Sequence, residues 1–155
     1  MSTTRALSAA FDTFLSGSKI FLNRDLLRHD YVPDALPHRH AQIGRLGGIL
    51  APSLGQSKVS NVLIYGKTGT GKTAVTRFVL NKLEEKAAEV GAPVHTLYVN
   101  CRLTGTNYRV LAHLCKAIRV SVPFTGVAVA EILDRFREAL NKKRRMLIVA
   151  LDEVD

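Results

Sequence analysis

The stretch "GKTGTGKT", residues 66–73, decides the fold of this chain, because it matches the pattern G-x-x-x-x-G-K-[S/T] at every specified position. The apolar run over 59–65 that precedes it predicts a buried strand. The apolar stripe over 72–90 that follows it predicts an amphipathic helix. A glycine-rich turn between a strand and a helix is the setting in which this pattern binds phosphate. The sequence therefore predicts a phosphate-binding loop.

The glycines of this loop let its backbone curl so that successive N–H groups face inward. With the N-terminus of the next helix, these donors form a cradle for the α- and β-phosphates of a nucleotide. Lys72 would reach the β- and γ-phosphates, and the Thr73 hydroxyl would bind Mg²⁺. The alternative is a glycine-rich turn without a ligand. The predicted nucleotide-binding residues are Gly66, Lys67, Thr68, Gly69, Thr70, Gly71, Lys72, Thr73 and Ala74.

The rest of the chain alternates helices with strands. Apolar spacing predicts a helix over 38–50 that Pro37 opens, followed by a turn-rich link over 51–58. Further elements are expected as a strand over 94–100, a helix from Thr106 or Asn107 to about Ile118, a helix over 129–141 and a strand over 146–151. Such alternation predicts a parallel sheet covered on both faces. The predicted fold class is α/β, a three-layer αβα sandwich of the P-loop NTPase type.

The last strand delivers acidic residues at its carboxyl end, the edge at which sheets of this kind bind ligands. We expect Asp152 to hold Mg²⁺ through water, together with Thr73, and Glu153 to orient the attacking water. Lys72, Asp152 and Glu153 are therefore the predicted catalytic residues. Asp155 either supports the site or is surface charge.

Composition favours an anionic ligand. The 155 residues carry 22 Lys and Arg against 13 Asp and Glu, a formal charge of +9. The densest basic run, 142–145, is either a solvated loop, which we favour, or a nucleic-acid contact. No apolar stretch approaches the roughly 20 residues that cross a bilayer, and no secretory signal is evident, so a soluble intracellular protein is expected.

Metal sites other than the nucleotide site are not predicted. Cys101 and Cys115 match no zinc-binding spacing, so we expect reduced thiols. His38 and His40 could imitate a metal pair, but two histidines alone are weak evidence for a metal site.

Four stretches together resemble the AAA+ ATPases and, more narrowly, the archaeal origin-recognition/cell-division-control (ORC/Cdc-type) replication initiators. They are "FLNRDLLRHDYVPDALPHRHAQI", "GKTGTGKT", "YVNCRLTGTNYRVLAHL" and "LDEVD", and they span roughly residues 21–155. The loop is typical of P-loop NTPases in general, whereas the "YVP" and "LPHR" stretch narrows the resemblance to initiators.

The resemblance implies that the segment before the loop helps to hold adenine. Carried over residue by residue, it places Tyr31, Val32, Pro37 and Arg39 near the base. A rigid, apolar, proline-kinked segment with one guanidinium also suits a flat aromatic ring. The alternative is a strap that only packs across the edge of the sheet.

The resemblance also implies an incomplete domain. We expect a mobile N-terminal arm with one short helix over 1–24, and the N-terminal part of an AAA+ ATPase domain over 25–155. In the family, a strand with a sensor residue, a lid domain and a winged-helix DNA-binding domain follow the acidic strand, and they are absent from these 155 residues. The sensor strand lies between the phosphate-loop strand and the acidic strand, so the sheet would lack a central strand.

The implied function is ATP binding by a replication initiator that recognises origins. ATP or ADP and Mg²⁺ are the implied cofactors. Origin DNA would bind through the absent regions, self-association would use AAA+ surfaces, no membrane is involved, and the location would be cytoplasmic and nucleoid-associated. The family hydrolyses ATP to ADP, whereas these residues alone should turn over weakly. The alternatives are another AAA+ loader-type ATPase and a non-hydrolysing nucleotide-binding module.

Overall fold

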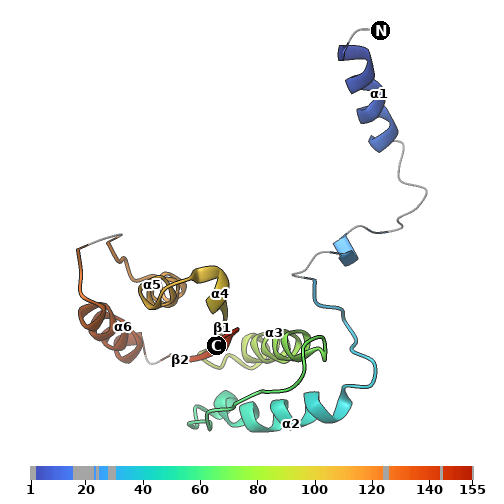
Figure 1. Cartoon of the computed structure of the whole chain (residues 1–155). Helices are drawn as coiled ribbons and strands as arrows, with labels where there is room; N and C mark the ends of the chain where they lie inside the picture. Colours follow the sequence, from blue (N-terminus) through green and yellow to red (C-terminus); the bar gives the residue numbers. More distant parts are fainter. Residues whose placement is uncertain are drawn as a thin grey trace. The chain divides into compact units, whose positions relative to one another are not determined.

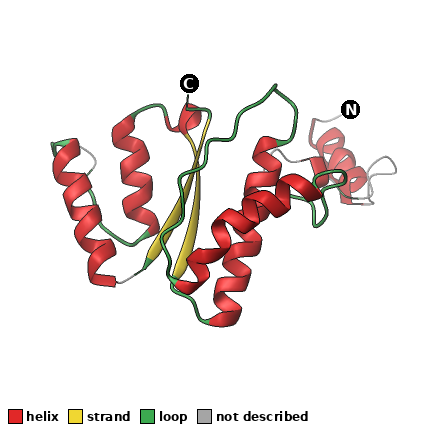
Figure 2. Ribbon diagram, turned by 90° about the horizontal axis from the view of Figure 1, so that it is seen from below, coloured by secondary structure: helices red, strands yellow, loops and turns green. Residues whose placement is uncertain are grey.

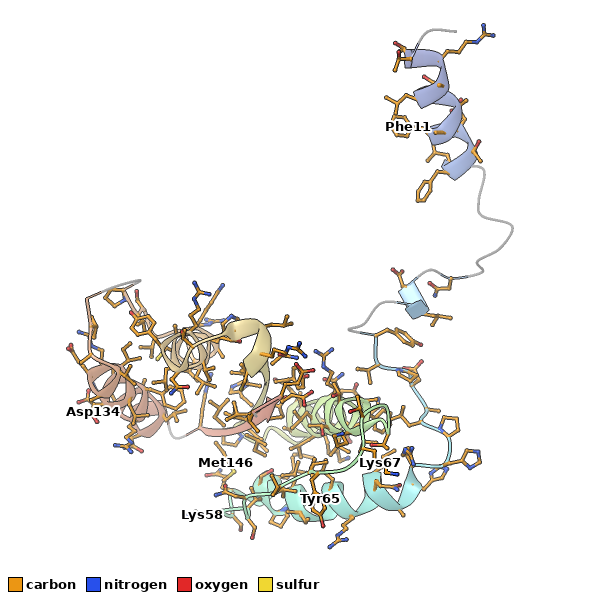
Figure 3. The ribbon with its side chains drawn as sticks, viewed as in Figure 1. Phe11, Lys58, Tyr65, Lys67, Asp134 and Met146 are labelled. Atoms are coloured by element: carbon orange, nitrogen blue, oxygen red, sulfur yellow. The ribbon has the colours of Figure 1, made fainter. Side chains whose placement is uncertain are left out.

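The computed structural model describes residues 3–15, 23, 25–27, 31–123, 126–143 and 145–154 of the chain. These residues form two compact units, Met1–Pro33 and Asp34–Asp155. The first unit contains helix α1, Thr3–Leu15, and the 3-10 helix η1, Asp25–Leu27. The short helix predicted in the N-terminal arm is thus confirmed. It buries none of its residues, and the ring of Phe11 projects from it (Figure 3).

The second unit is built on two parallel strands, β1, Val94–Asn100, and β2, Met146–Asp152. Their register pairs Val94 with Met146 and Asn100 with Asp152. Because both strands end at the same level, Asp152 lies at the carboxyl edge of the sheet. Both strands were predicted, and β2 is one residue longer than expected.

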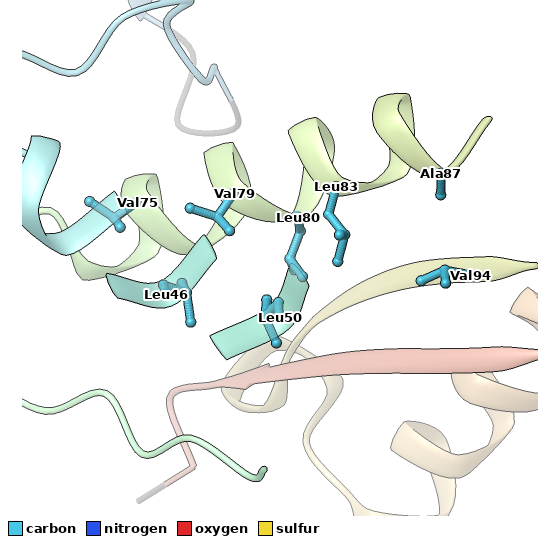
Figure 4. Close-up of a cluster of buried hydrophobic side chains, with 8 residues drawn as sticks. All are labelled: Leu46, Leu50, Val75, Val79, Leu80, Leu83, Ala87 and Val94. Atoms are coloured by element: carbon cyan, nitrogen blue, oxygen red, sulfur yellow. The ribbon is translucent and has the colours of Figure 1, made fainter. Parts of the chain in front are cut away.

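Helices α2, His40–Leu50, and α3, Lys72–Val90, cover one face of the strands (Figures 1 and 2). Apolar residues at helical spacing on α3 point toward α2 and β1 and form the main core (Figure 4). The buried members of this core are Leu46, Leu50, Val75, Val79, Leu80, Leu83, Ala87 and Val94. Helix α3 ends at Gly91, whose φ of 68° is left-handed and whose N–H caps the last turn.

Helices α5, Asn107–Ala117, and α6, Val129–Lys143, lie on the other side of the strands (Figure 1). A short helix α4, Cys101–Thr104, which the sequence did not predict, links β1 to α5. The side chain of Asn100 accepts from the backbone N–H of Leu103 at 3.0 Å and caps α4. Among the apolar side chains buried in this half are Val99, Cys115, Ile118 and Ile132. The result is the predicted αβα layering, with both predicted helices confirmed.

The predicted strand over 59–65 is wrong. Residues 57–67 run as an extended segment without helix or strand, and Tyr65 lies on it outside the sheet (Figure 3). Leu63 and Tyr65 are 80% and 86% exposed. The physical reason is that a strand needs a neighbour for its backbone hydrogen bonds, and no described residue pairs with this segment in a sheet.

The start of α2 and the link that follows it also differ from the prediction, and α6 ends two residues later than predicted. Helix α2 begins at His40 rather than 38, because His38 has a left-handed φ of 58° and Arg39 is not helical. The link over 51–58 contains the 3-10 helix η2, Ala51–Gly55, which Gln56 ends in a left-handed conformation. Among the described residues, no helix has both the length and the apolar character needed to cross a membrane.

The packing of α6 beside α5 predicts how much stability is lost when a buried side chain of α6 is shortened. Replacement Ile132→Ala should lower the free energy of unfolding by about 3 kcal/mol, because Ile132 is fully buried. Urea denaturation measures the difference. The control Asp134→Ala, at an exposed position of the same helix, should change it by less than about 0.5 kcal/mol. Equal effects of both substitutions would contradict the burial of this face.

Candidate nucleotide-binding site

The loop of residues 66–73 curls around the N-terminus of α3. Gly71 is the N-terminal cap residue of α3 and has a left-handed φ of 80°, which glycine adopts without strain. A Cβ atom added there would lie 3.7 Å from Nε of Arg39. Arg39 therefore lies beside the loop, and its place near the base stays a prediction.

The side chain of Lys72 folds back over this loop. Its Nζ donates hydrogen bonds to the carbonyl oxygens of Gly66, at 2.8 Å, and Lys67, at 3.0 Å. The Thr70 hydroxyl donates to the same Lys67 oxygen at 2.8 Å. These bonds keep the ammonium group at the centre of the loop, where a phosphate group on the cradle would meet it.

Asp152, at the end of β2, meets Thr73, in the first turn of α3. The Thr73 hydroxyl donates a hydrogen bond to Oδ2 of Asp152 at 2.7 Å, across 79 positions of sequence. The two residues predicted to hold the metal are thus in direct contact. Two oxygen ligands suit Mg²⁺, which usually keeps several waters and rarely takes an all-protein cage.

The sequence reasoning missed two further residues, Tyr98, which contacts Asp152, and Arg77, which contacts Tyr98. The Tyr98 hydroxyl, on β1, donates to the same Oδ2 at 2.5 Å. The guanidinium of Arg77 stacks on the Tyr98 ring, 4.1 Å from its centroid. A usable signal was present, because Tyr98 is a polar aromatic near the carboxyl end of an apolar strand and Arg77 follows Thr73 by about one helical turn.

These contacts keep Asp152 ionised. Partial burial alone would raise the pKa of its carboxyl group, but other contributions outweigh it. Hydrogen bonds from Tyr98, Thr73 and the backbone N–H of Glu153, with the charge of Arg77, bring the pKa below its ordinary value. Burial, and then the bond to Asp152, raises the pKa of Tyr98, so its phenol stays protonated and donates.

Glu153 is attached to this site through its backbone only. Its N–H donates to Oδ1 of Asp152 at 3.0 Å, and its φ of 53° is left-handed. Its side chain is exposed and has no hydrogen bond to another described residue. The assignment of Glu153 to the attacking water stays a prediction, and Asp155 lies outside the described residues.

The remaining predicted positions differ in what can be said of them. Pro37 is exposed, and its place near the base stays a prediction. Tyr31 and Val32 belong to the first unit, so their place near the base also stays a prediction. Within the described ranges, no three His, Cys, Asp or Glu side chains gather in a way that could hold a metal ion. Cys115 is fully buried, and burial raises the pKa of its thiol.

Known proteins share this architecture. A protein-family model described as an AAA domain matches residues 56–155. The ORC1-type DNA replication protein 1 of Aeropyrum pernix is 50% identical over 138 residues, which are 89% of this chain and 35% of that protein. The structure of the Aeropyrum pernix ORC1 protein in complex with DNA has a TM-score of 0.85 and 50% identity, over 90% of this chain and 36% of that one.

A second solved structure extends the likeness. The Aeropyrum pernix ORC2 protein, in its ADPNP–ADP complexes, has a TM-score of 0.71 and 26% identity, over 86% of this chain and 35% of that one. The chain spans about a third of the length of the curated relatives that it matches. These findings confirm the resemblance inferred from the sequence and the P-loop type of αβα fold. The chain belongs to the AAA domain family, within which it is similar to the ORC1-type DNA replication proteins.

Proposed function

We propose that this chain is the ATP-binding part of a DNA replication initiator that acts at origins. The observation that carries the proposal is the 2.7 Å bond between the Thr73 hydroxyl and the Asp152 carboxylate, next to the phosphate loop. The relatives support it further, since one solved structure contains DNA and another contains ADPNP and ADP.

Each residue of the site has a defined task in this proposal. Backbone N–H groups of 66–73 and the ammonium of Lys72 bind the phosphates of ATP. Thr73 and Asp152 would hold Mg²⁺, Asp152 through water, and the ion would supply positive charge to the phosphates. Glu153 orients the water that attacks the γ-phosphate. Arg39, which lies beside Gly71, borders the base. Pro37, Tyr31 and Val32 keep the assignment near the base that the family resemblance implies.

The proposal includes the domain organisation. Residues 1–24 form an arm, and 25–155 form the N-terminal part of an AAA+ domain whose sensor strand, lid and winged-helix domain belong to the rest of a longer protein. The exposed apolar run Val62–Tyr65 fits such a role, because a further strand could cover it. On the same grounds we propose that the longer protein binds origin DNA and that it self-associates through AAA+ surfaces. A cytoplasmic, nucleoid-associated location is part of the same proposal.

A second candidate is a nucleotide-binding module that does not hydrolyse ATP. The exposed Glu153 side chain, without a hydrogen-bond partner among the described residues, favours it. Positioning and charge stabilisation dominate phosphoryl transfer, so a loosely held water-orienting residue gives slow turnover. Titration with fluorescent ATP and a separate assay of phosphate release distinguish the candidates. Binding with slow but measurable turnover supports the ATPase, binding without any turnover supports the module, and no binding refutes both.

The first substitution tests the loop. Lys72→Ala should weaken ATP binding about 100-fold or more, because it removes a charged donor worth about 3 kcal/mol. Fluorescence titration gives the affinity. Lys82→Ala is the matched control on the same helix, since Lys82 is exposed and pairs with Glu85 instead. Retained affinity in the Lys72 variant would show that the loop is not the binding site.

The second substitution tests the acidic strand. Asp152→Asn should leave ATP affinity in EDTA within about twofold of the parent chain, yet remove most of the gain that Mg²⁺ provides, because an amide binds Mg²⁺ poorly. Titrations with and without Mg²⁺ measure both quantities. The exposed carboxylate of Asp134 offers a control, and Asp134→Asn should change neither. An unchanged Mg²⁺ effect in the Asp152 variant would remove Asp152 from the metal site.

A further inference from the structure

Two hydroxyl groups converge on one oxygen of Asp152. Thr73, from α3, and Tyr98, from β1, both donate to Oδ2, while Oδ1 accepts the N–H of Glu153. A carboxylate oxygen offers two lone-pair positions, so these two donors engage Oδ2 fully. The rotation of the carboxylate is fixed from three sides.

The two donors differ in their freedom to move. The hydroxyl of Thr73 turns about a single bond and has lone pairs of its own for a metal ion. The Tyr98 ring is half-buried in the sheet, and Arg77 covers it at 4.1 Å. An Arg guanidinium stacks flat on an aromatic ring, a geometry that a lysine ammonium does not reproduce. Tyr98 is thus the donor that stays in place when Thr73 turns toward a metal ion.

We propose that Tyr98, held by the stacked guanidinium of Arg77, is the positioning residue that orients Asp152 toward the metal ion. This inference rests on the proposed nucleotide site and assigns it two further residues. Tyr98 touches neither nucleotide nor metal in this account and acts only through Oδ2 of Asp152. Hydrogen-bond partners of metal ligands commonly change metal affinity by about 10- to 100-fold when they are removed.

The arrangement also links three parts of the site mechanically. Thr73 and Arg77 are one turn apart on α3, Tyr98 is on β1, and Asp152 ends β2. The phosphate loop is continuous with α3, so the same helix that starts at the phosphates carries the group that fixes Tyr98. Movement of α3 at the loop would therefore change the orientation of Asp152.

Tyr98→Phe tests the inference, with Mg²⁺-dependent binding of fluorescent ADP to the 155-residue chain as the readout. The Mg²⁺ concentration for half-maximal effect should rise about tenfold, whereas ADP affinity in EDTA should not change. The matched control is Tyr108→Phe on α5, which removes a hydroxyl that donates to the carbonyl oxygen of Pro123. It should leave the half-maximal Mg²⁺ concentration unchanged. An unchanged or lower half-maximal Mg²⁺ concentration in the Tyr98 variant would overturn the inference.

Variants of Arg77 and a double substitution separate positioning from a loss of structure. Arg77→Gln should raise the half-maximal Mg²⁺ concentration, as Tyr98→Phe does. Arg77→Lys should raise it less, because the lysine keeps the positive charge. In an Asp152→Asn background, Tyr98→Phe should have no further effect on ADP affinity at fixed Mg²⁺, because Tyr98 acts through Asp152. Additive effects would overturn the inference.

The outcomes for the parent chain distinguish the two proposals. Nucleotide binding that Mg²⁺ strengthens, together with an unchanged Tyr98 variant, would refute the positioning role alone and leave the proposed function intact. A parent chain that binds no nucleotide would refute both. Thermal unfolding of each variant, followed without nucleotide, shows whether a change in Mg²⁺ requirement accompanies lost stability.

Discussion

The hydrogen bond between Thr73 and Asp152 is the constraint on which the site depends. It joins the first turn of α3 to the last residue of β2, and these elements meet only because β1 and β2 pair in parallel with Asn100 opposite Asp152. A shift of one residue in that register would move Asp152 to the opposite face of the strand. Apolar packing fixes the register from both sides, with α2 and α3 on one face and α5 and α6 on the other.

Short-range sequence patterns predicted most of the helices and the phosphate loop of this fold. Helix α3 has an apolar stripe and a terminal glycine, and its observed bounds equal the predicted ones. The Thr106 side chain caps α5 by accepting from the N–H of Arg109, which a short-range pattern also indicates. The loop 66–73 was recognisable because its chemistry requires residue types at fixed spacing.

The features that the sequence did not reveal depend on partners far along the chain. The run 59–65 has the composition of a strand, but composition does not supply the neighbouring backbone that a strand needs. The contacts of Thr73 and Tyr98 with Asp152 join three separate elements, and the sequence places each residue near an element's end without specifying which partner it meets. The left-handed conformation of Glu153 is likewise a property of the folded chain.

The extended run Val62–Tyr65 has a consequence for the behaviour of the chain in solution. A formal charge of +9 makes molecules repel one another and favours dispersion. At physiological ionic strength salt screens that repulsion beyond about 8 Å, whereas it leaves the attraction between exposed apolar side chains in place. Val62–Tyr65 have exposed apolar side chains and a backbone outside the described sheet. Attraction between these residues on different molecules therefore counteracts the repulsion that the net charge provides. Colloidal stability of this polypeptide should thus decline as ionic strength rises, with these residues among the exposed apolar groups through which molecules associate.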